Sequence, residues 1–257
     1  MKIIPLDSAT EPIFWRYVED RIEEYFFFIM DYRQNPDVTR IWMAVDDVGK
    51  IQGMLLNYKD KNVHIRGNDE AVKKLADQID IRSPEITVLN SQKELLSPKD
   101  KEHKIEVLIN RMVIHLGENL IINKFSSEIL EESDREEIAS LYRKADPVFW
   151  SHVQGEDVEL DENHIWFGIK REKRIVSFAN IWIGDEIGII PTVATDPDFR
   201  NQGFATSLVS RSIQELFKHT PLGLIHVRAD NAPAVHAYEK IGFKNIFQYS
   251  EYKKKKD

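Results

Sequence analysis

A strand-like run that ends in a short turn and restarts as a helix, over residues 193–206, constrains this chain more than any other feature. The run reads Val-Ala-Thr-Asp-Pro-Asp-Phe-Arg-Asn-Gln-Gly-Phe-Ala-Thr, and Gly203 and Ala205 keep the turn free of bulky side chains. The first amides of a helix have no intrahelical partner and lie at the positive end of its dipole. The run therefore predicts a phosphate-binding turn, with the amides of residues 201–206 as donors and Arg200 adding charge at its rim.

The helix after the turn has an apolar face and a clear end at residues 220–223. That face is formed by Leu208, Val209, Ser212, Ile213, Leu216 and Phe217. A second motif follows. Residues 224–228 form a buried-strand pattern, Asn231 is placed as a helix cap, and Gly242 is a natural helix terminator. Tyr238 falls about two turns into this second helix.

Composition narrows the class of protein. The chain has 257 residues, a formal net charge of -8 and no cysteine. The acidic balance argues against nucleic acid as a partner, and the lack of cysteine excludes disulfides, thiolate metal sites and a protein thioester. No run of residues has the length and apolar character of a membrane span or a secretory signal. We expect a cytoplasmic protein, monomeric or homodimeric, with no membrane partner and no metal.

Two segments 124 residues apart share one pattern. Ile41–Ile51 and Ile165–Ile175 both open with Ile-Trp, pass through a charged turn and close on Ile, as antiparallel hairpins do. A helix precedes each hairpin, and the second helix opens with Ser133-Asp-Arg-Glu136, a predicted capping box. We infer two related α/β units divided near Gly117-Glu118, against the alternative that the hairpins recur by chance.

The turn at 200–205 and the segment from Asn231 through Tyr238 to Phe243 resemble the GNAT superfamily of acyl-CoA N-acyltransferases in order and spacing. The resemblance covers roughly residues 119–257. It implies a fold class of α/β (α+β) type, in which tandem GNAT-like domains each have a mixed, mostly antiparallel sheet flanked by helices. It also implies that the fourth and fifth strands of the C-terminal domain splay apart. Pro191 fits a bulge there, although an edge strand explains it equally.

The same resemblance implies a site for acetyl-CoA as co-substrate. The pantetheine arm would lie between the splayed strands and the diphosphate on the helix that opens at Gly203. Asn231 would contact the arm, cap the helix or do both, and Tyr238 would protonate the departing thiolate. The residues expected to bind the cofactor are Val193, Ala194, Thr195, Arg200, Asn201, Gln202, Gly203, Phe204, Ala205, Thr206, Asn231 and Tyr238.

The general base stays open. Many members of the family use a glutamate on the fourth strand, but Ile189 occupies that position here, and the nearest carboxylates are Asp185 and Glu186. Glu186 acting through a water, His226 on the fifth strand and an acceptor that arrives neutral all remain possible. The expected catalytic residues are Tyr238 and Glu186.

The first unit diverges after its hairpin. It has a strand, a helix and a strand at 62–66, 68–78 and 85–90, but no glycine-rich turn opens the helix. We expect residues 1–117 to form a degenerate GNAT-like domain without a coenzyme A site, and residues 118–257 to form the N-acetyltransferase domain. The aromatic run Tyr25–Phe28 either packs a core or lines an acceptor channel, and packing is favoured.

The favoured function is transfer of an acetyl group from acetyl-CoA to a primary amine by direct attack in a ternary complex. Two alternatives stay open: a non-catalytic acyl-CoA-binding or regulatory protein, and an N-acyltransferase that uses a longer acyl-CoA.

Overall fold

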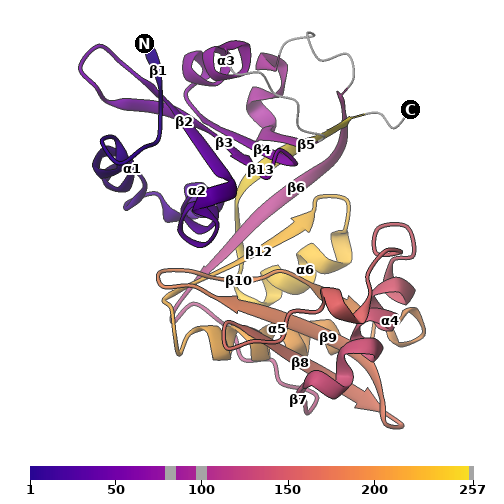
Figure 1. Ribbon diagram of the computed structural model, residues 1–257. Helices are drawn as coiled ribbons and strands as arrows, with labels where there is room; N and C mark the ends of the chain where they lie inside the picture. The colour runs from indigo at the N-terminus through magenta and orange to yellow at the C-terminus, as the bar shows by residue number, and fades with distance from the viewer. Residues whose placement is uncertain (79–84, 97–102, 255–257) are drawn as a thin grey trace. The chain divides into compact units, whose positions relative to one another are not determined.

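The computed structural model describes residues 1–78, 85–96 and 103–254, and its contacts divide the chain into two compact units (Figure 1). Unit 1 comprises Met1–Arg111, Arg228–Asp230 and Phe247–Asp257, and unit 2 comprises Met112–Val227 and Asn231–Ile246. The chain enters unit 2 along β6 (His103–His115) and returns along β13 (Lys244–Lys254). The contacts therefore divide the chain at Arg111–Met112 and assign the end of β13 to unit 1, because β13 pairs with a strand of that unit.

Unit 2 carries both sequence motifs. Its sheet runs in the order β12-β10-β9-β8-β7, with β11 paired to β9. Its elements are β7 (Glu128–Ile129), α4 (Arg135–Ala145), β8 (His164–Arg171), β9 (Arg174–Ile183), β10 (Gly188–Ile190), β11 (Val193–Thr195), α5 (Phe204–Leu216), β12 (Leu222–Arg228) and α6 (Ala232–Ile241). The predicted hairpin, the helix after the turn and the helix that ends before Gly242 are confirmed.

Both faces of the unit 2 sheet are covered, because its central strands are apolar on both sides. Phe167, Ile169 and Ile181 pack in one core with α5 and α6, whereas the alternate residues Trp166 and Phe178 pack in another with α4. Successive side chains of a strand point to opposite faces, so α4 and α5 lie on opposite sides of β8 and β9 (Figure 1).

The predicted capping box at Ser133 is wrong. The reciprocal bonds join Glu131 and Asp134 instead, around a short 3-10 turn, and α4 begins at Arg135. The Glu131 amide donates to the Asp134 carboxylate at 2.9 Å. The turn inserted before the helix moves the cap two residues toward the N-terminus.

Unit 1 repeats the arrangement of a sheet with helices on both faces. Residues Ile41 and Met43 pack with α1 and α2, whereas the alternate residue Ala44 packs with α3. The predicted packing of the aromatic run is confirmed for Tyr25 and Phe28, each 1% exposed in the core beside α1. The elements, in the sheet order β1-β2-β3-β4-β5-β13, are β1 (Lys2–Pro5), α1 (Glu11–Val18), α2 (Ile22–Gln34), β2 (Thr39–Val45), β3 (Ile51–Tyr58), β4 (Asn62–Gly67), α3 (Asp69–Gln78) and β5 (Glu85–Leu89).

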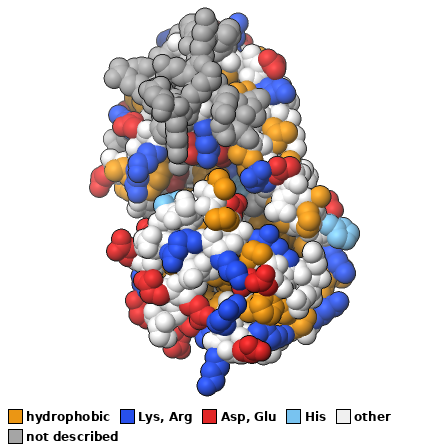
Figure 2. Space-filling view, turned by 90° about the vertical axis from the view of Figure 1, so that its right-hand side faces the viewer, with side chains coloured by type: hydrophobic (Ala, Val, Ile, Leu, Met, Phe, Trp, Pro, Cys, Tyr) orange, Lys and Arg blue, Asp and Glu red, His pale blue; other side chains and the backbone are white. Residues whose placement is uncertain are grey.

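Basic and acidic side chains are interspersed over the face drawn in Figure 2. Within the described ranges, no helix is both long enough and apolar enough to span a bilayer.

Candidate functional site

Strand β9 pairs with two different strands in succession, and a bulge at Pro191 and Thr192 separates them. Its end near Trp182 pairs with β10, and its middle pairs with β11. Asn180 lies opposite the bulge. Its side-chain oxygen accepts from the Thr192 backbone amide at 3.0 Å, and its backbone amide donates to the Thr192 carbonyl at 3.1 Å. A bulge re-aims the chain that carries it. Pro191, which has no amide to donate, occupies this irregular position.

Replacing Asn180 with leucine is expected to destabilise the protein by about 1–3 kcal/mol, because the Thr192 amide would lose its acceptor at a buried position. Asn180 is 5% exposed. Urea denaturation followed by tryptophan fluorescence would measure the loss. An unchanged midpoint would show that the amide finds another partner and that Asn180 does not hold the bulge.

The bulge makes β10 and β11 differ in their neighbours. Gly188–Ile190 pair in parallel with Gly223–Ile225 of β12, whereas β11 pairs only with β9 in the described part of the chain. Residues Thr192 and Asp196 hydrogen-bond to β9 through their backbones, so the alternate residues Val193 and Thr195 turn their backbone groups away from it. The predicted splay of the fourth and fifth strands is confirmed, and the open edge of β11 faces the gap.

Residues 196–203 join β11 to α5, and no side chain caps the N-terminus of α5. Asn201 and Gly203 have positive φ angles of 62° and 90°, which turn successive amides to one side. The N-cap residue, Gly203, has no side chain that could cap the helix, and no described residue accepts from the amides of residues 201–206. A Cβ placed on Gly203 would meet only a ring carbon of Phe125, at 3.9 Å. The amides are thus open to an anion.

Charged side chains fix the turn between β11 and α5. Asp196 accepts from Lys144 at 2.7 Å and from Arg174 at 3.2 Å, and it caps the following turn through the Asp198 amide. Burial alone would raise the pKa of Asp196, but the Lys144 hydrogen bond and its charge lower it overall. The guanidinium of Arg200 donates to the carbonyls of Ala145 and Thr195. Arg200 therefore holds the turn against the end of α4, rather than extending from the rim.

Tyr238 lies in the core beside the splayed strands. Its side chain is 7% exposed, and burial raises the pKa of its hydroxyl above the ordinary value. The hydroxyl has no hydrogen-bond partner among the residues that the structure describes. Asn231 caps α6 because its side-chain oxygen accepts from the Ala234 amide at 3.3 Å. The NH2 group of the same side-chain amide is left to donate elsewhere. Because burial raises the pKa of Tyr238, its hydroxyl is protonated at neutral pH and can donate a hydrogen bond.

The structure separates the base candidates. Glu186 precedes β10 by two residues, so the whole of β10 lies between it and the bulge. His226 follows Ile225, the residue of β12 that pairs with Ile190, and so lies where the strands diverge. It is partly buried.

The corresponding position in unit 1 is closed by the chain's own side chains. Asn68 caps α3 by accepting from the Ala71 amide at 2.9 Å, and Asp69 places a carboxylate in the first turn. Beyond the parallel pair His64–Thr87, the Arg66 guanidinium donates to the Thr87 carbonyl at 3.1 Å. A phosphate at this helix would meet an occupied amide and negative charge.

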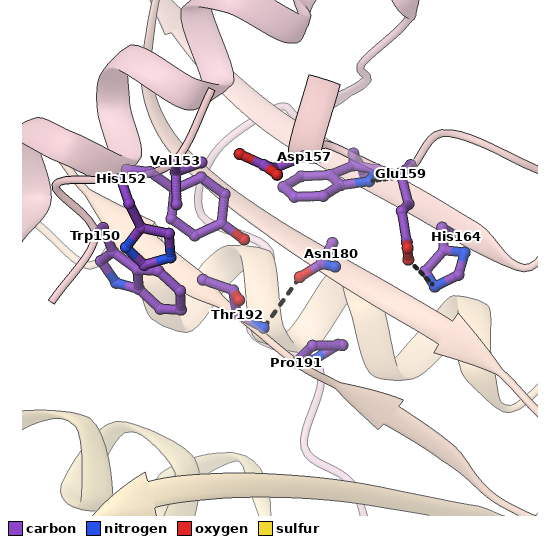
Figure 3. A pocket seen from close by; sticks show the side chains of 11 residues that line it. Trp150, His152, Val153, Asp157, Glu159, His164, Asn180, Pro191 and Thr192 are labelled. Carbon is purple, nitrogen blue, oxygen red and sulfur yellow. Dashed lines mark hydrogen bonds and ion pairs between the residues drawn. The ribbon is translucent and has the colours of Figure 1, made fainter. Parts of the chain in front are cut away.

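A cavity of about 270 Å³ opens beside the bulge in unit 2 (Figure 3). Sequence reasoning missed it, although Asn180, a polar residue within an apolar strand, was a usable signal. Within the described ranges, no group of three or more His, Asp or Glu side chains is arranged to hold a metal ion. The cavity is lined by Tyr142, Trp150, His152, Val153, Asp157, Glu159, His164, Trp166, Asn180, Pro191 and Thr192.

Comparison with known proteins agrees with this geometry. Residues 131–243 match the model of the acetyltransferase (GNAT) family. The [ribosomal protein bS18]-alanine N-acetyltransferase of Escherichia coli (strain K12) is 31% identical over 83 residues, which are 32% of this chain and 56% of that protein. The chain thus matches little more than half the length of this curated relative.

Solved structures show the same fold over nearly the whole chain. A GCN5-related N-acetyltransferase from Sphaerobacter thermophilus is similar with a TM-score of 0.63 and 12% identity, over 98% of this chain and 95% of that one. A tandem GNAT protein from the clavulanic acid biosynthesis pathway is similar with a TM-score of 0.56 and 11% identity, over 98% and 97%. The predicted fold class is confirmed, and residues 131–243 of this chain are similar to the acetyltransferase (GNAT) family.

Proposed function

We propose that unit 2 transfers an acetyl group from acetyl-CoA to a primary amine by direct attack within a ternary complex. The observation that carries this proposal is the open edge of β11 beside the uncapped amides of α5. Acetyl-CoA supplies the activated thioester. Both features fit it, because a strand edge can pair with the amides of the pantetheine arm and free amides can bind a diphosphate.

The binding residues follow from this placement. The backbones of Val193 and Thr195 would hydrogen-bond the pantetheine arm, with Ala194 keeping β11 in register on β9. The diphosphate would accept from the amides of residues 201–206. The free amino group of Asn231 would donate to the arm from the opposite wall.

In the proposed reaction, the amine nitrogen attacks the thioester carbonyl and forms the new C–N bond. The C–S bond breaks, and the sulfur leaves with the proton of the Tyr238 hydroxyl. Burial raises the pKa of Tyr238, so its hydroxyl carries a proton at neutral pH when the sulfur departs. The attacking amine must also lose a proton. Glu186 lies before β10, away from the bulge, whereas His226 lies where the strands diverge, so we propose that His226 takes this proton.

We further propose that unit 1 binds no coenzyme A, because Asn68 and Arg66 occupy the corresponding helix end and strand gap. Calorimetric titration of the full chain with acetyl-CoA is therefore expected to give one site per chain. Two sites would contradict the assignment of unit 1, and no binding would contradict the proposed function.

Turnover is tested by the appearance of free thiol on mixing acetyl-CoA with a panel of primary amines. Binding of acetyl-CoA without thiol release from any amine would favour the non-catalytic alternative. Titrations with acyl-CoAs of increasing chain length distinguish the acetyl donor from a longer one: an acetyl-CoA enzyme is expected to bind the longer thioesters no more tightly.

A further inference from the structure

The cavity beside the bulge has an acidic wall. His164 lies between two carboxylates, with its Nδ1 2.9 Å from Asp161 and its Nε2 3.2 Å from Glu159. Asp157 adds a third carboxylate, which accepts from the Gln154 amide at 2.8 Å. Two carboxylates therefore flank the imidazole and Asp157 adds another on the same wall, so the wall stays negative even when His164 is protonated. No lysine or arginine occurs among the lining residues that the structure describes.

The same cavity has an aromatic wall. The Tyr142 ring contacts Trp150 edge-on, with centroids 4.9 Å apart, and lies 6.1 Å from Trp166. The Trp166 indole donates to the Glu159 carbonyl at 2.7 Å, which ties the acidic wall to the aromatic one. Aromatic faces attract cations, and the attraction is strongest where water is excluded. Rings and carboxylates together select a positively charged group.

The two ends of the cavity differ. Figure 3 shows Asp157, Glu159 and His164 on one side, and Pro191 and Thr192 on the other, with Asn180 between them. The Thr192 end is the bulge, where the strands begin to splay, and it adjoins β11, along which the proposed function places the pantetheine arm. At about 270 Å³, the cavity is slightly smaller than those that hold drug-sized ligands. It suits a short, flexible molecule.

We propose that the acceptor is a small aliphatic amine that carries a second cationic group. The reacting amine lies at the Thr192 end, and the second cation lies between the aromatic rings and the carboxylates of Glu159 and Asp157. This inference rests on the proposed function, since it names the substrate of the same site.

Matched amines test it on the full chain. Cadaverine and n-pentylamine have the same carbon chain, but only cadaverine keeps a cation after one amine loses its proton. The specificity constant kcat/KM, measured by thiol release, is expected to be at least about tenfold higher for cadaverine. Equal values for the two amines would overturn the inference and leave acetyl transfer intact.

Variants locate the second cation. Glu159→Gln keeps the shape of the side chain and removes its charge, so it is expected to lower kcat/KM for cadaverine about tenfold and to leave n-pentylamine unchanged. Glu162→Gln is the matched control, because Glu162 is an exposed carboxylate on the same loop that does not line the cavity. Equal losses for both amines in Glu159→Gln would contradict the placement.

Direct binding separates the inference from the proposed reaction. Equilibrium dialysis of radiolabelled cadaverine against the wild type and Glu159→Gln needs no turnover, and circular dichroism checks the fold of the variant. Glu159-dependent binding without thiol release would support the cation site and contradict the transferase. A peptide with an N-terminal alanine that is acetylated faster than every small amine would overturn the inference, because such a peptide extends beyond this cavity.

Discussion

Replacing Tyr238 with phenylalanine is expected to lower kcat at neutral pH by about 10²- to 10⁴-fold, the usual contribution of a positioned general acid. The acetyl-CoA dissociation constant should change by less than about twofold, because the substitution removes only an oxygen and leaves the buried ring in place. Thiol release under saturating acetyl-CoA measures kcat, and calorimetry measures the affinity. A variant with unchanged turnover would remove Tyr238 from the mechanism.

The pH profile gives an independent check. Burial raises the pKa of Tyr238, so its hydroxyl is protonated at neutral pH and stays protonated further into the alkaline range than an exposed tyrosine does. An alkaline loss of kcat below pH 10 therefore should not come from Tyr238. Any acidic limb, by contrast, reports a group that must lose its proton, and it should persist in Tyr238→Phe. Tyr58→Phe in unit 1 serves as the matched tyrosine control.

Local patterns in the sequence were sufficient for most elements of the fold. The hairpin of β8 and β9 and the turn at Gly203 each follow from residues only a few positions apart. Both could therefore be predicted from the sequence alone. The capping box at Ser133 failed for the same reason. Its pattern fits locally, but an added turn at Glu131–Asp134 satisfies the amides first.

The cavity beside the bulge could not be predicted in this way. Its wall brings together Tyr142 of α4, His164 of β8 and Thr192 of the bulge, which are up to 50 residues apart in the sequence. No periodicity joins such positions. Arg200 shows the same limit. Its motif was recognised from neighbouring residues, but the carbonyl that fixes its side chain to α4, that of Ala145, lies 55 residues away in the sequence.

The strongest test of the proposed phosphate-binding turn is the substitution Gly203→Asp. An aspartate at the N-cap of α5 would offer its own carboxylate to the free amides and would repel a diphosphate there. Like charges about 4 Å apart cost about 4 kcal/mol near a protein surface, so acetyl-CoA affinity is expected to fall by at least about 100-fold. Isothermal titration calorimetry measures this directly.

Gly203→Asn isolates the effect of charge. Both substituted residues must adopt the same positive φ of 90°, which strains any residue with a Cβ, and both have the same shape. There is room for either, since the nearest side-chain atom to a Cβ at this position is the Phe125 ring carbon at 3.9 Å. The two variants should therefore melt at similar temperatures, while the asparagine retains clearly more of the affinity. Equal affinities in the two would mean that the diphosphate lies elsewhere, and the open amides of α5 would then no longer support an acetyl-CoA site.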